Sequence, residues 1–327
     1  MGDDTPLKHL YFCRYRINLC AREEIVLPPY KGNVFRGVFG RALRTIVCQT
    51  RHAECDGCRL RLQCVYSLLM GSPVADDYPH AAKYKTPPRP YIMVPPLTKK
   101  RQFSPDEPFA FNITLVGLSN KYLSYFILAF IEMGRMGLGK NRGRFDVVTV
   151  EAIDADGAAQ QIFCGHTGEL KQTTSEIRYE TFENTMHAPD KIGIFFETQV
   201  RIKQHDELTP DVPFQLLIER LAERAFLLAH FYCGAEMADH MAFTESAGTV
   251  ETVTDNLKWA DWKRYSGSHK AEMTWGGWQS IIIYKGNIQK YFPLLRVGEY
   301  LHVGKAATFG LGKYRIVKNI SHVGQGL

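Results

Sequence analysis

The sequence lacks any long hydrophobic run. None of its apolar stretches approaches the about 18 residues that a membrane-spanning helix needs. Its first residues, Met1–Asp4, include two acidic side chains and no apolar signal region. We therefore expect a cytoplasmic protein without a membrane partner. Disulfides are then not expected among its eight cysteines, because the cytoplasm keeps thiols reduced.

A strong excess of either charge is also absent. The chain carries 40 Lys and Arg against 34 Asp and Glu, which gives a net charge of +6. This mild basic excess permits a polyanionic partner without requiring one. The hydrophobic content of 45% is typical of a folded protein with a core, and 327 residues are enough for two domains.

Familiar catalytic motifs are missing as well. The sequence contains no zinc-protease motif, no nucleophile elbow and no pattern of paired carboxylates. It also lacks the two named nucleotide loops, although Gly312-Lys313 is reminiscent of one. Tyr314 and strand-like residues follow this dipeptide, whereas Walker A continues with Ser or Thr into a helix and the dinucleotide fingerprint also precedes a helix.

The segment 304–312 and the residue after it are rich in glycine and lysine. Glycine permits a positive φ and close approach of another backbone, and successive N–H groups in such a turn form an anion-binding concavity. The residues concerned are Gly304, Lys305, Gly310, Gly312 and Lys313. They predict a cradle for phosphate, while a simple tight turn is the alternative.

Both halves of the chain predict the same order of elements. In the first half we expect strands at 10–20, 91–94, 109–116 and 147–153, and helices at 33–47 and 119–136 with Asn33 and Ser119 as N-caps. In the second half we expect strands at 192–202, 259–266, 279–285 and 314–317, and helices from 214 and at 292–302. Each half ends with helix, Gly-Leu-Gly-Lys and strand. The sequence therefore predicts an α+β fold of tandem ferredoxin-like (βαββαβ, RRM-like) domains, 1–160 and 161–327.

Four cysteines cluster in a segment at about 48–70 of the first domain. They are spaced as Cys48-x6-Cys55-x2-Cys58-x5-Cys64. A closed set of four thiolates is a structural zinc site, and the same ligands can hold an iron–sulfur cluster. His52 inside the segment could replace one cysteine, and unrelated free thiols are the remaining alternative. We expect a structural metal, zinc ahead of iron–sulfur.

Four stretches resemble a known family. They are Gly304-x5-Gly310-x-Gly312 before the last strand, Arg264-Tyr265-Ser266, Phe35-Arg36-Gly37-x-Phe39-Gly40 in the first helix, and Gly137-Leu138-Gly139. Together they resemble the RAMP superfamily of CRISPR-associated proteins, and most closely its repeat-processing endoribonucleases. The resemblance spans nearly the whole chain and implies the same tandem fold. Relative to that family, the four-cysteine segment is an insertion.

The resemblance implies cleavage of CRISPR precursor RNA within the repeat, with no cofactor in the reaction. The 2′-hydroxyl attacks the adjacent phosphate and leaves a 2′,3′-cyclic phosphate and a 5′-hydroxyl on the way to mature guide RNAs. This needs a base, an acid and cations. The family's catalytic histidine lies on or near the first helix, but helix 33–47 contains none. The catalytic candidates are Tyr30, Lys31, Arg36 and His302, with a structural helix-end role as the alternative for His302.

The expected partner is CRISPR repeat RNA, held through its phosphates and by stacking on aromatic side chains. The RNA-binding candidates are Arg14, Arg16, Gly139, Lys140, Arg142, Arg264, Tyr265, Lys270, Gly304, Lys305, Gly310, Gly312 and Lys313. Other CRISPR effector subunits are further expected partners. Two other functions stay open: a non-catalytic RNA-binding subunit of an effector complex, and an unrelated metal-cluster enzyme that modifies RNA.

Overall fold

The computed structural model divides the chain into two units. The first unit, here called the N-terminal unit, comprises Leu10–Ile177 and Leu227–Ala235. The second, the C-terminal unit, comprises Met1–His9, Arg178–Phe226 and Glu236–Leu327. The structure describes residues 5–50, 54–80, 83–84, 86–171, 175–183, 188–205, 207–266 and 271–318, with the backbone alone at 262–266 and 271–274.

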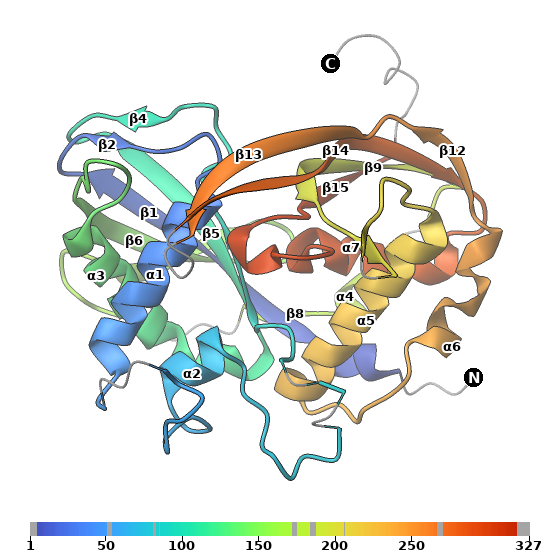
Figure 1. Ribbon diagram of the computed structural model, residues 1–327, viewed down its shortest axis with the longest axis horizontal. Helices are drawn as coiled ribbons and strands as arrows, with labels where there is room; N and C mark the ends of the chain where they lie inside the picture. The colour runs from blue at the N-terminus through green and yellow to red at the C-terminus, as the bar shows by residue number, and fades with distance from the viewer. Residues whose placement is uncertain are drawn as a thin grey trace. The chain divides into compact units, whose positions relative to one another are not determined.

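The N-terminal unit is built on one antiparallel sheet (Figure 1). Its strands are β1 (Tyr11–Ala21), β3 (Tyr91–Val94), β5 (Pro108–Val116), β6 (Phe145–Ile153) and β7 (Ala159–Cys164), in the order β3-β5-β1-β6-β7. β8 (Ile177–Arg178), where the chain passes to the other unit, pairs with β1. A separate short ribbon joins β2 (Ile25–Val26) to β4 (Gln102–Phe103). When β7, β8 and the ribbon are left aside, the remaining order β3-β5-β1-β6 is that of a ferredoxin-like sheet.

The strand β1 is central because its side chains alternate. Tyr15, Ile17 and Leu19 are buried, whereas Arg16 between them is exposed. Ile17 pairs with Phe111 of β5 on one side and with Val150 of β6 on the other. This period of two turns one face of the strand into the hydrophobic core.

Two helices cover that face of the sheet, α1 (Gly32–Val47) and α3 (Leu123–Met136), and they lie side by side (Figure 1). Phe39 of α1 packs within 5.7 Å of the rings of Tyr91, Phe126 and Phe130. Such aromatic pairs stabilise a core by about 0.5–1.5 kcal/mol each beyond their buried area. The short helix α2 (Val65–Met70) packs against α1.

The two predicted helix caps are wrong. Helix α1 begins at Gly32, and Lys31 occupies the N-cap position without a side-chain cap. Asn33 lies inside the first turn, because the carbonyl of Lys31 already accepts from the N–H groups of Val34 and Phe35. The Oγ of Ser119 donates to the carbonyls of Pro90 and Val116 within a 3-10 turn that precedes α3.

The C-terminal unit repeats the arrangement. Its sheet contains β9 (Lys191–Val200), β12 (Glu251–Asp255), β13 (Lys258–Ser266), β14 (Ala271–Lys285) and β15 (Tyr314–Val317), in the order β12-β14-β9-β15 with β13 on β14. Its main helices are α5 (Phe214–Cys233), which ends in the N-terminal unit, and α7 (Phe292–Leu301).

Short elements complete the chain. They are α4 (Glu180–Glu183), α6 (Met241–Thr244), the ribbon of β10 (Lys203–Gln204) and β11 (Glu207–Leu208), and the 3-10 turns η1 (Pro6–His9), η2 (Gly117–Tyr122), η3 (Glu245–Thr249), η4 (Gln289–Tyr291) and η5 (Ala307–Phe309). Both units follow the βαββαβ order, so the predicted α+β fold of tandem ferredoxin-like domains is confirmed. Across the described ranges, no helix combines the length and the apolar character needed to cross a membrane.

Candidate functional site

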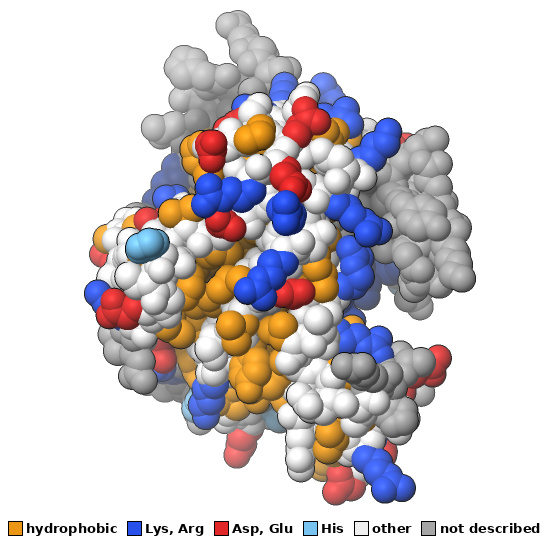
Figure 2. All heavy atoms as spheres, turned by 90° about the vertical axis from the view of Figure 1, so that its left-hand side faces the viewer, with side chains coloured by type: hydrophobic (Ala, Val, Ile, Leu, Met, Phe, Trp, Pro, Cys, Tyr) orange, Lys and Arg blue, Asp and Glu red, His pale blue; other side chains and the backbone are white. Residues whose placement is uncertain are grey.

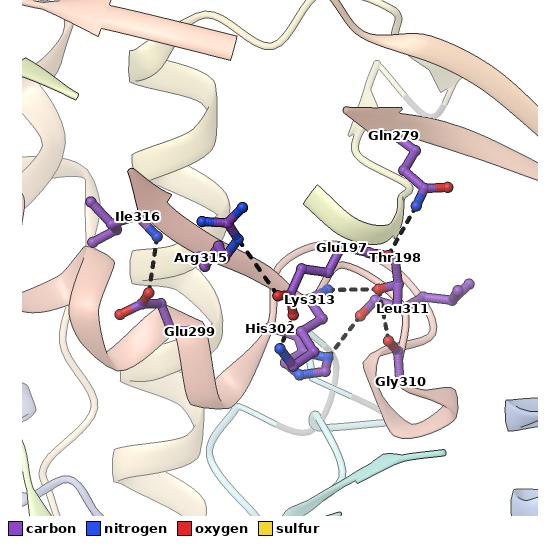
Figure 3. Close-up of polar contacts among 10 residues, drawn as sticks. All are labelled: Glu197, Thr198, Gln279, Glu299, His302, Gly310, Leu311, Lys313, Arg315 and Ile316. Carbon is purple, nitrogen blue, oxygen red and sulfur yellow. Dashed lines mark hydrogen bonds and ion pairs between the residues drawn. The ribbon is translucent and has the colours of Figure 1, made fainter. Parts of the chain in front are cut away.

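The glycine-rich loop between α7 and β15 lies along strand β9. The N–H groups of Lys305 and Gly312 donate to the carbonyls of Arg201 and Gln199, both at 2.9 Å. The Oγ1 of Thr198 donates to the carbonyl of Gly310 at 2.8 Å (Figure 3). The loop is therefore held to the sheet along much of its length.

The glycines of this loop are required by its path. Gly304, Gly310 and Gly312 have φ values of 81°, 86° and 69°, which side chains rarely allow. A Cβ on Gly312 would lie 1.8 Å from the carbonyl oxygen of Val303, and one on Gly304 would lie 2.6 Å from that of Arg201. Packing against the protein's own backbone is thus sufficient to explain these two glycines.

Most backbone donors of the loop are engaged inside the protein. The N–H groups that donate to acceptors in the loop or in the neighbouring strand segment are those of Val303, Lys305, Phe309, Gly310, Gly312 and Lys313. A phosphate would therefore be bound mainly by lysine side chains rather than by a nest of N–H groups. Lys313 pairs with Glu197, which also faces the Nε of Arg315 at 3.8 Å (Figure 3). Lys305 is exposed, so it is the better placed of the two predicted phosphate contacts.

His302 ends helix α7 and is buried, with 1% of its surface exposed. Its backbone has φ 59° and ψ 165°, a combination that residues other than glycine rarely adopt. Its Nδ1 donates to the carbonyl of Leu311 at 3.1 Å (Figure 3), because a carbonyl oxygen can only accept. Burial, reinforced by the charge of Lys313, lowers the pKa of His302 to about 3. The imidazole is neutral at pH 7, which favours the structural alternative over the acid or base role.

A second cluster surrounds the start of helix α1 in the N-terminal unit. Lys31 directly precedes the helix, is only 2% exposed, and donates from its Nζ to the carbonyl of Thr98 at 2.6 Å. Burial and then the charge of Arg101 lower the pKa of Lys31. The N-terminus of a helix carries positive partial charge of its own. Positive charge therefore accumulates at this point, where an anion would be complementary.

The sequence prediction missed Arg101. Its Nε donates to the carbonyl of Leu27 at 3.1 Å, and its own carbonyl accepts from the N–H of Leu27 at 2.7 Å. These bonds extend the β2–β4 ribbon and bring Arg101 beside the segment that leads into α1. The run Lys99-Lys100-Arg101 was a possible signal, but nothing in the sequence connects it to Lys31.

Tyr30 and Arg36 lie on either side of the start of α1, and both are half-buried. Burial raises the pKa of Tyr30, so its phenol stays protonated at neutral pH. Gly37, next to Arg36, leaves an open surface, because the nearest atom to a Cβ there is in the Arg41 side chain at 4.0 Å. The three candidates from the first helix region, Tyr30, Lys31 and Arg36, are therefore close in the chain and share the start of one helix.

The first Gly-Leu-Gly-Lys turn packs against the same entry segment. A Cβ on Gly139 would lie 2.1 Å from the carbonyl oxygen of Val26, and the N–H of Lys140 donates to that carbonyl at 3.0 Å. The side chains of Lys140 and Arg142 are exposed. The turn and Arg101 therefore flank residues 26–31 through separate hydrogen bonds, and both add positive charge near α1.

The other predicted RNA contacts are less grouped. On β1, Arg14 is half-buried, and exposed Arg16 lies 4.0 Å from the carboxylate of Glu151. Arg264 and Tyr265 lie in β13, where the structure describes the backbone alone, and Lys270 lies outside the described residues. Figure 2 shows basic side chains interspersed with acidic ones around a hydrophobic centre on the face turned to the viewer. Net charge alone therefore does not locate an RNA-binding face.

The four clustered cysteines all line one cavity in the N-terminal unit. Among the described residues, no group of three or more thiol, imidazole or carboxylate side chains is already arranged to hold a metal ion. His52 lies outside the described residues. The metal site thus stays a prediction.

Comparison with known proteins identifies the family. A family model described as the CRISPR-associated endoribonuclease Cas6 matches residues 194–314. A second family model, described as an N-terminal domain, matches residues 10–175. The chain belongs to the CRISPR repeat-processing endoribonuclease family. The predicted family is therefore confirmed.

Relatives of this Cas6-family chain match it over nearly its whole length. A protein of Archaeoglobus fulgidus described as uncharacterized is 25% identical over 322 residues, which cover 95% of this chain and 97% of the relative. A Cas6 product complex matches with a TM-score of 0.56 and 13% identity, over 94% of this chain and 99% of that one. Thermus thermophilus Cas6 matches with a TM-score of 0.53 and 12% identity, over 94% and 99% of the two chains.

A partial Cas6-RT-Cas1–Cas2 complex also matches, with a TM-score of 0.54 and 14% identity, over 97% of this chain and 48% of that one. At these identities the solved structures show a shared fold. The resemblance places a catalytic histidine on or near the first helix, and helix α1 contains no histidine across Gly32–Val47.

Proposed function

We propose that the chain is a metal-independent endoribonuclease that cuts CRISPR precursor RNA within the repeat. The observation that carries the proposal is the cationic start of helix α1. There Lys31 is buried beside Arg101 at the positive end of a helix. Among the described residues no carboxylate pairs with Lys31 or Arg101, whose side chains donate to backbone carbonyls. Such a positive site favours binding of an external anion, which in RNA is a phosphate.

In the proposed reaction, the 2′-hydroxyl attacks the adjacent phosphorus as its proton leaves. The bond from phosphorus to the 5′-oxygen breaks, and that oxygen takes up a proton. The products are a 2′,3′-cyclic phosphate and a 5′-hydroxyl. Negative charge develops on the phosphate oxygens, so cations fixed in advance lower the barrier more than mobile ones do.

The roles of the three residues at the start of α1 follow from their protonation. Lys31 and Arg36 supply charge to the phosphate. Tyr30 keeps its proton, since burial raises its pKa, and therefore suits donation to the leaving oxygen rather than removal of a proton. The lowered pKa of Lys31 increases the fraction that is neutral. A neutral Lys31 that accepts the 2′-hydroxyl proton becomes a cation as negative charge develops on the phosphate. His302 has no proton-transfer role in this scheme, because it is buried and neutral.

RNA binding in the proposal uses exposed cations in each of the two units. Lys140 and Arg142 extend the positive charge around residues 26–31, and Lys305 contacts the backbone of the RNA from the glycine-rich loop. Glycines 139, 304, 310 and 312 act indirectly, by holding the two turns. Arg14, Arg16, Arg264, Tyr265 and Lys270 remain candidate contacts.

A non-catalytic repeat-binding subunit is the second candidate function. It is favoured by a specific observation: α1 has no histidine, and His302 is neutral and buried. A protein of this kind would bind the repeat tightly, leave it intact and join other effector subunits.

Cleavage of labelled repeat RNA separates the two functions. The full chain is incubated with the RNA in EDTA, and the ends of the products are analysed. The proposal predicts cleavage at one position with a 2′,3′-cyclic phosphate and a 5′-hydroxyl. Tight binding with intact RNA after prolonged incubation would favour the binding subunit.

A further inference from the structure

The cysteine segment joins two helices of the N-terminal unit. Cys48 is the residue directly after α1, and Cys64 directly precedes α2. Over residues 55–64 the chain forms turns: the N–H of Cys58 donates to the carbonyl of Cys55 at 3.0 Å, and the N–H of Cys64 donates to that of Leu60 at 2.8 Å. Two thiols thus lie at helix ends and two in one tight turn.

All four thiols border the same space. A cavity of about 460 Å³ is lined by these four cysteines, which are half-buried and reduced. The chain's other cysteines, Cys13, Cys20, Cys164 and Cys233, do not line it. The segregation of half of the cysteines around one cavity is hard to attribute to ordinary packing.

The segment has little hydrophobic support of its own. Leu60 and Leu62 are 44% and 43% exposed, so its leucines do not form a core. Small loop-rich segments without a core are commonly held by a metal or a disulfide, and none of these four cysteines is in a disulfide.

We propose that these four thiolates bind one zinc ion that fastens the end of α1 to the start of α2. The Cys-x2-Cys turn has the spacing of structural zinc sites, and four protein ligands leave no open position for a substrate. The thiols are not yet grouped as a ligand set, so binding draws them together and releases their protons, which couples zinc to the folding of this segment.

The zinc site lies far from the proposed chemistry. Helix α1 has 16 residues, so its two ends are about 24 Å apart at about 1.5 Å per residue. Zinc at Cys48 therefore cannot touch a phosphate bound at Lys31. Its role is to hold α1, which makes this inference independent of the proposed RNA cleavage.

The test uses the full-length chain purified with zinc in the medium. Elemental analysis should find about one zinc per chain, and X-ray absorption should show four sulfur neighbours at about 2.3 Å. Cys58→Ser should lose most of the zinc and melt about 10 °C lower. The matched control Cys20→Ser, in β1 and away from the cavity, should keep both the zinc and the melting temperature.

The wild-type measurements keep the test decisive even if Cys58→Ser fails to fold. Wild-type protein that contains no metal after zinc reconstitution, with the same melting temperature as untreated protein, would overturn the proposal. A brown protein with iron and inorganic sulfide would overturn it in favour of an iron–sulfur cluster. Equal loss of zinc in Cys20→Ser would show that the ion is bound elsewhere.

Discussion

His302 should make the C-terminal unit sensitive to mild acid. Its pKa is about 3 in the folded chain, against an ordinary value of 6.5. Between these two values the unfolded imidazole binds a proton and the folded one does not. Unfolding is therefore favoured as the pH falls below 6.5, and the full stabilisation is present only above that value.

The expected loss of unfolding free energy follows from the folded and unfolded pKa values of His302. Lowering the pH from 7.5 to 5.0 should cost about 2 kcal/mol of unfolding free energy through His302 alone. The cost would reach about 4 kcal/mol at pH 3. His302 is almost fully buried, so water does not screen this effect, and its Nδ1 is held by the carbonyl of Leu311.

The assay compares wild type with His302→Asn in denaturant at both pH values. Asparagine does not titrate in this range and is among the residues that best tolerate a positive φ. All four tryptophans lie between residues 259 and 278, so their fluorescence reports on the C-terminal unit. The stability difference between the two proteins should shift by about 2 kcal/mol against wild type at pH 5.0.

A stability difference between wild type and His302→Asn that stays constant with pH would contradict the lowered pKa of His302. It would mean that the folded imidazole titrates normally and is therefore accessible to water. An acid or base role for His302 would then regain support. An inflection near pH 6.5 in the cleavage rate that disappears in His302→Asn would lead to the same conclusion.

Three further predictions concern Lys31 and the glycine-rich loop before β15. Lys31→Met should slow cleavage by about 10²-fold or more. Its melting temperature should be equal to that of wild type or higher, because the folded chain already disfavours the charge at this buried position. Cleavage at the wild-type rate would contradict the catalytic role of Lys31. Gly312→Ala should lower the free energy of unfolding by about 3 kcal/mol or more. Gly157→Ala is the control, because Gly157 also has a positive φ but no atom lies within 4 Å of the added Cβ, and it should cost about 1–2 kcal/mol. Equal losses would show that backbone crowding at residue 312 is unimportant. Lys305→Ala should weaken binding of repeat RNA and lower the salt dependence of that binding by about one unit of slope. Lys313→Ala should have a smaller effect, since Lys313 is paired with Glu197. The reverse order would indicate that this ion pair opens on RNA binding.

The repeated fold was predictable because its signals are local. Alternation along residues 10–20 and the Gly-Leu-Gly-Lys endings at 137 and 310 depend only on neighbouring residues. The structure adds what local patterns hide. Strand β14 begins at Ala271 rather than near 279, because Gly276 and Gly277 interrupt the pattern: a Cβ on either would lie within 2.8 Å of Trp259 or of the Val200 carbonyl.

The candidate site was predictable only in part. Tyr30, Lys31 and Arg36 were found because they adjoin one predicted helix. Arg101 lies 70 positions from Lys31 and reaches it through β2 and β4, strands of two residues that carry no periodicity. The burial of His302 depends on the path of the glycine-rich loop over β9, which the sequence does not reveal.

In the proposed reaction the nucleophile is the RNA's own 2′-hydroxyl. The direct test compares two repeat RNAs that differ by a single 2′-deoxy substitution before the scissile phosphate, with binding and single-turnover cleavage measured in EDTA. We expect near-equal affinity for both RNAs and cleavage of the unmodified one alone. Cleavage of the deoxy RNA at a comparable rate, or no cleavage of either despite tight binding, would contradict it.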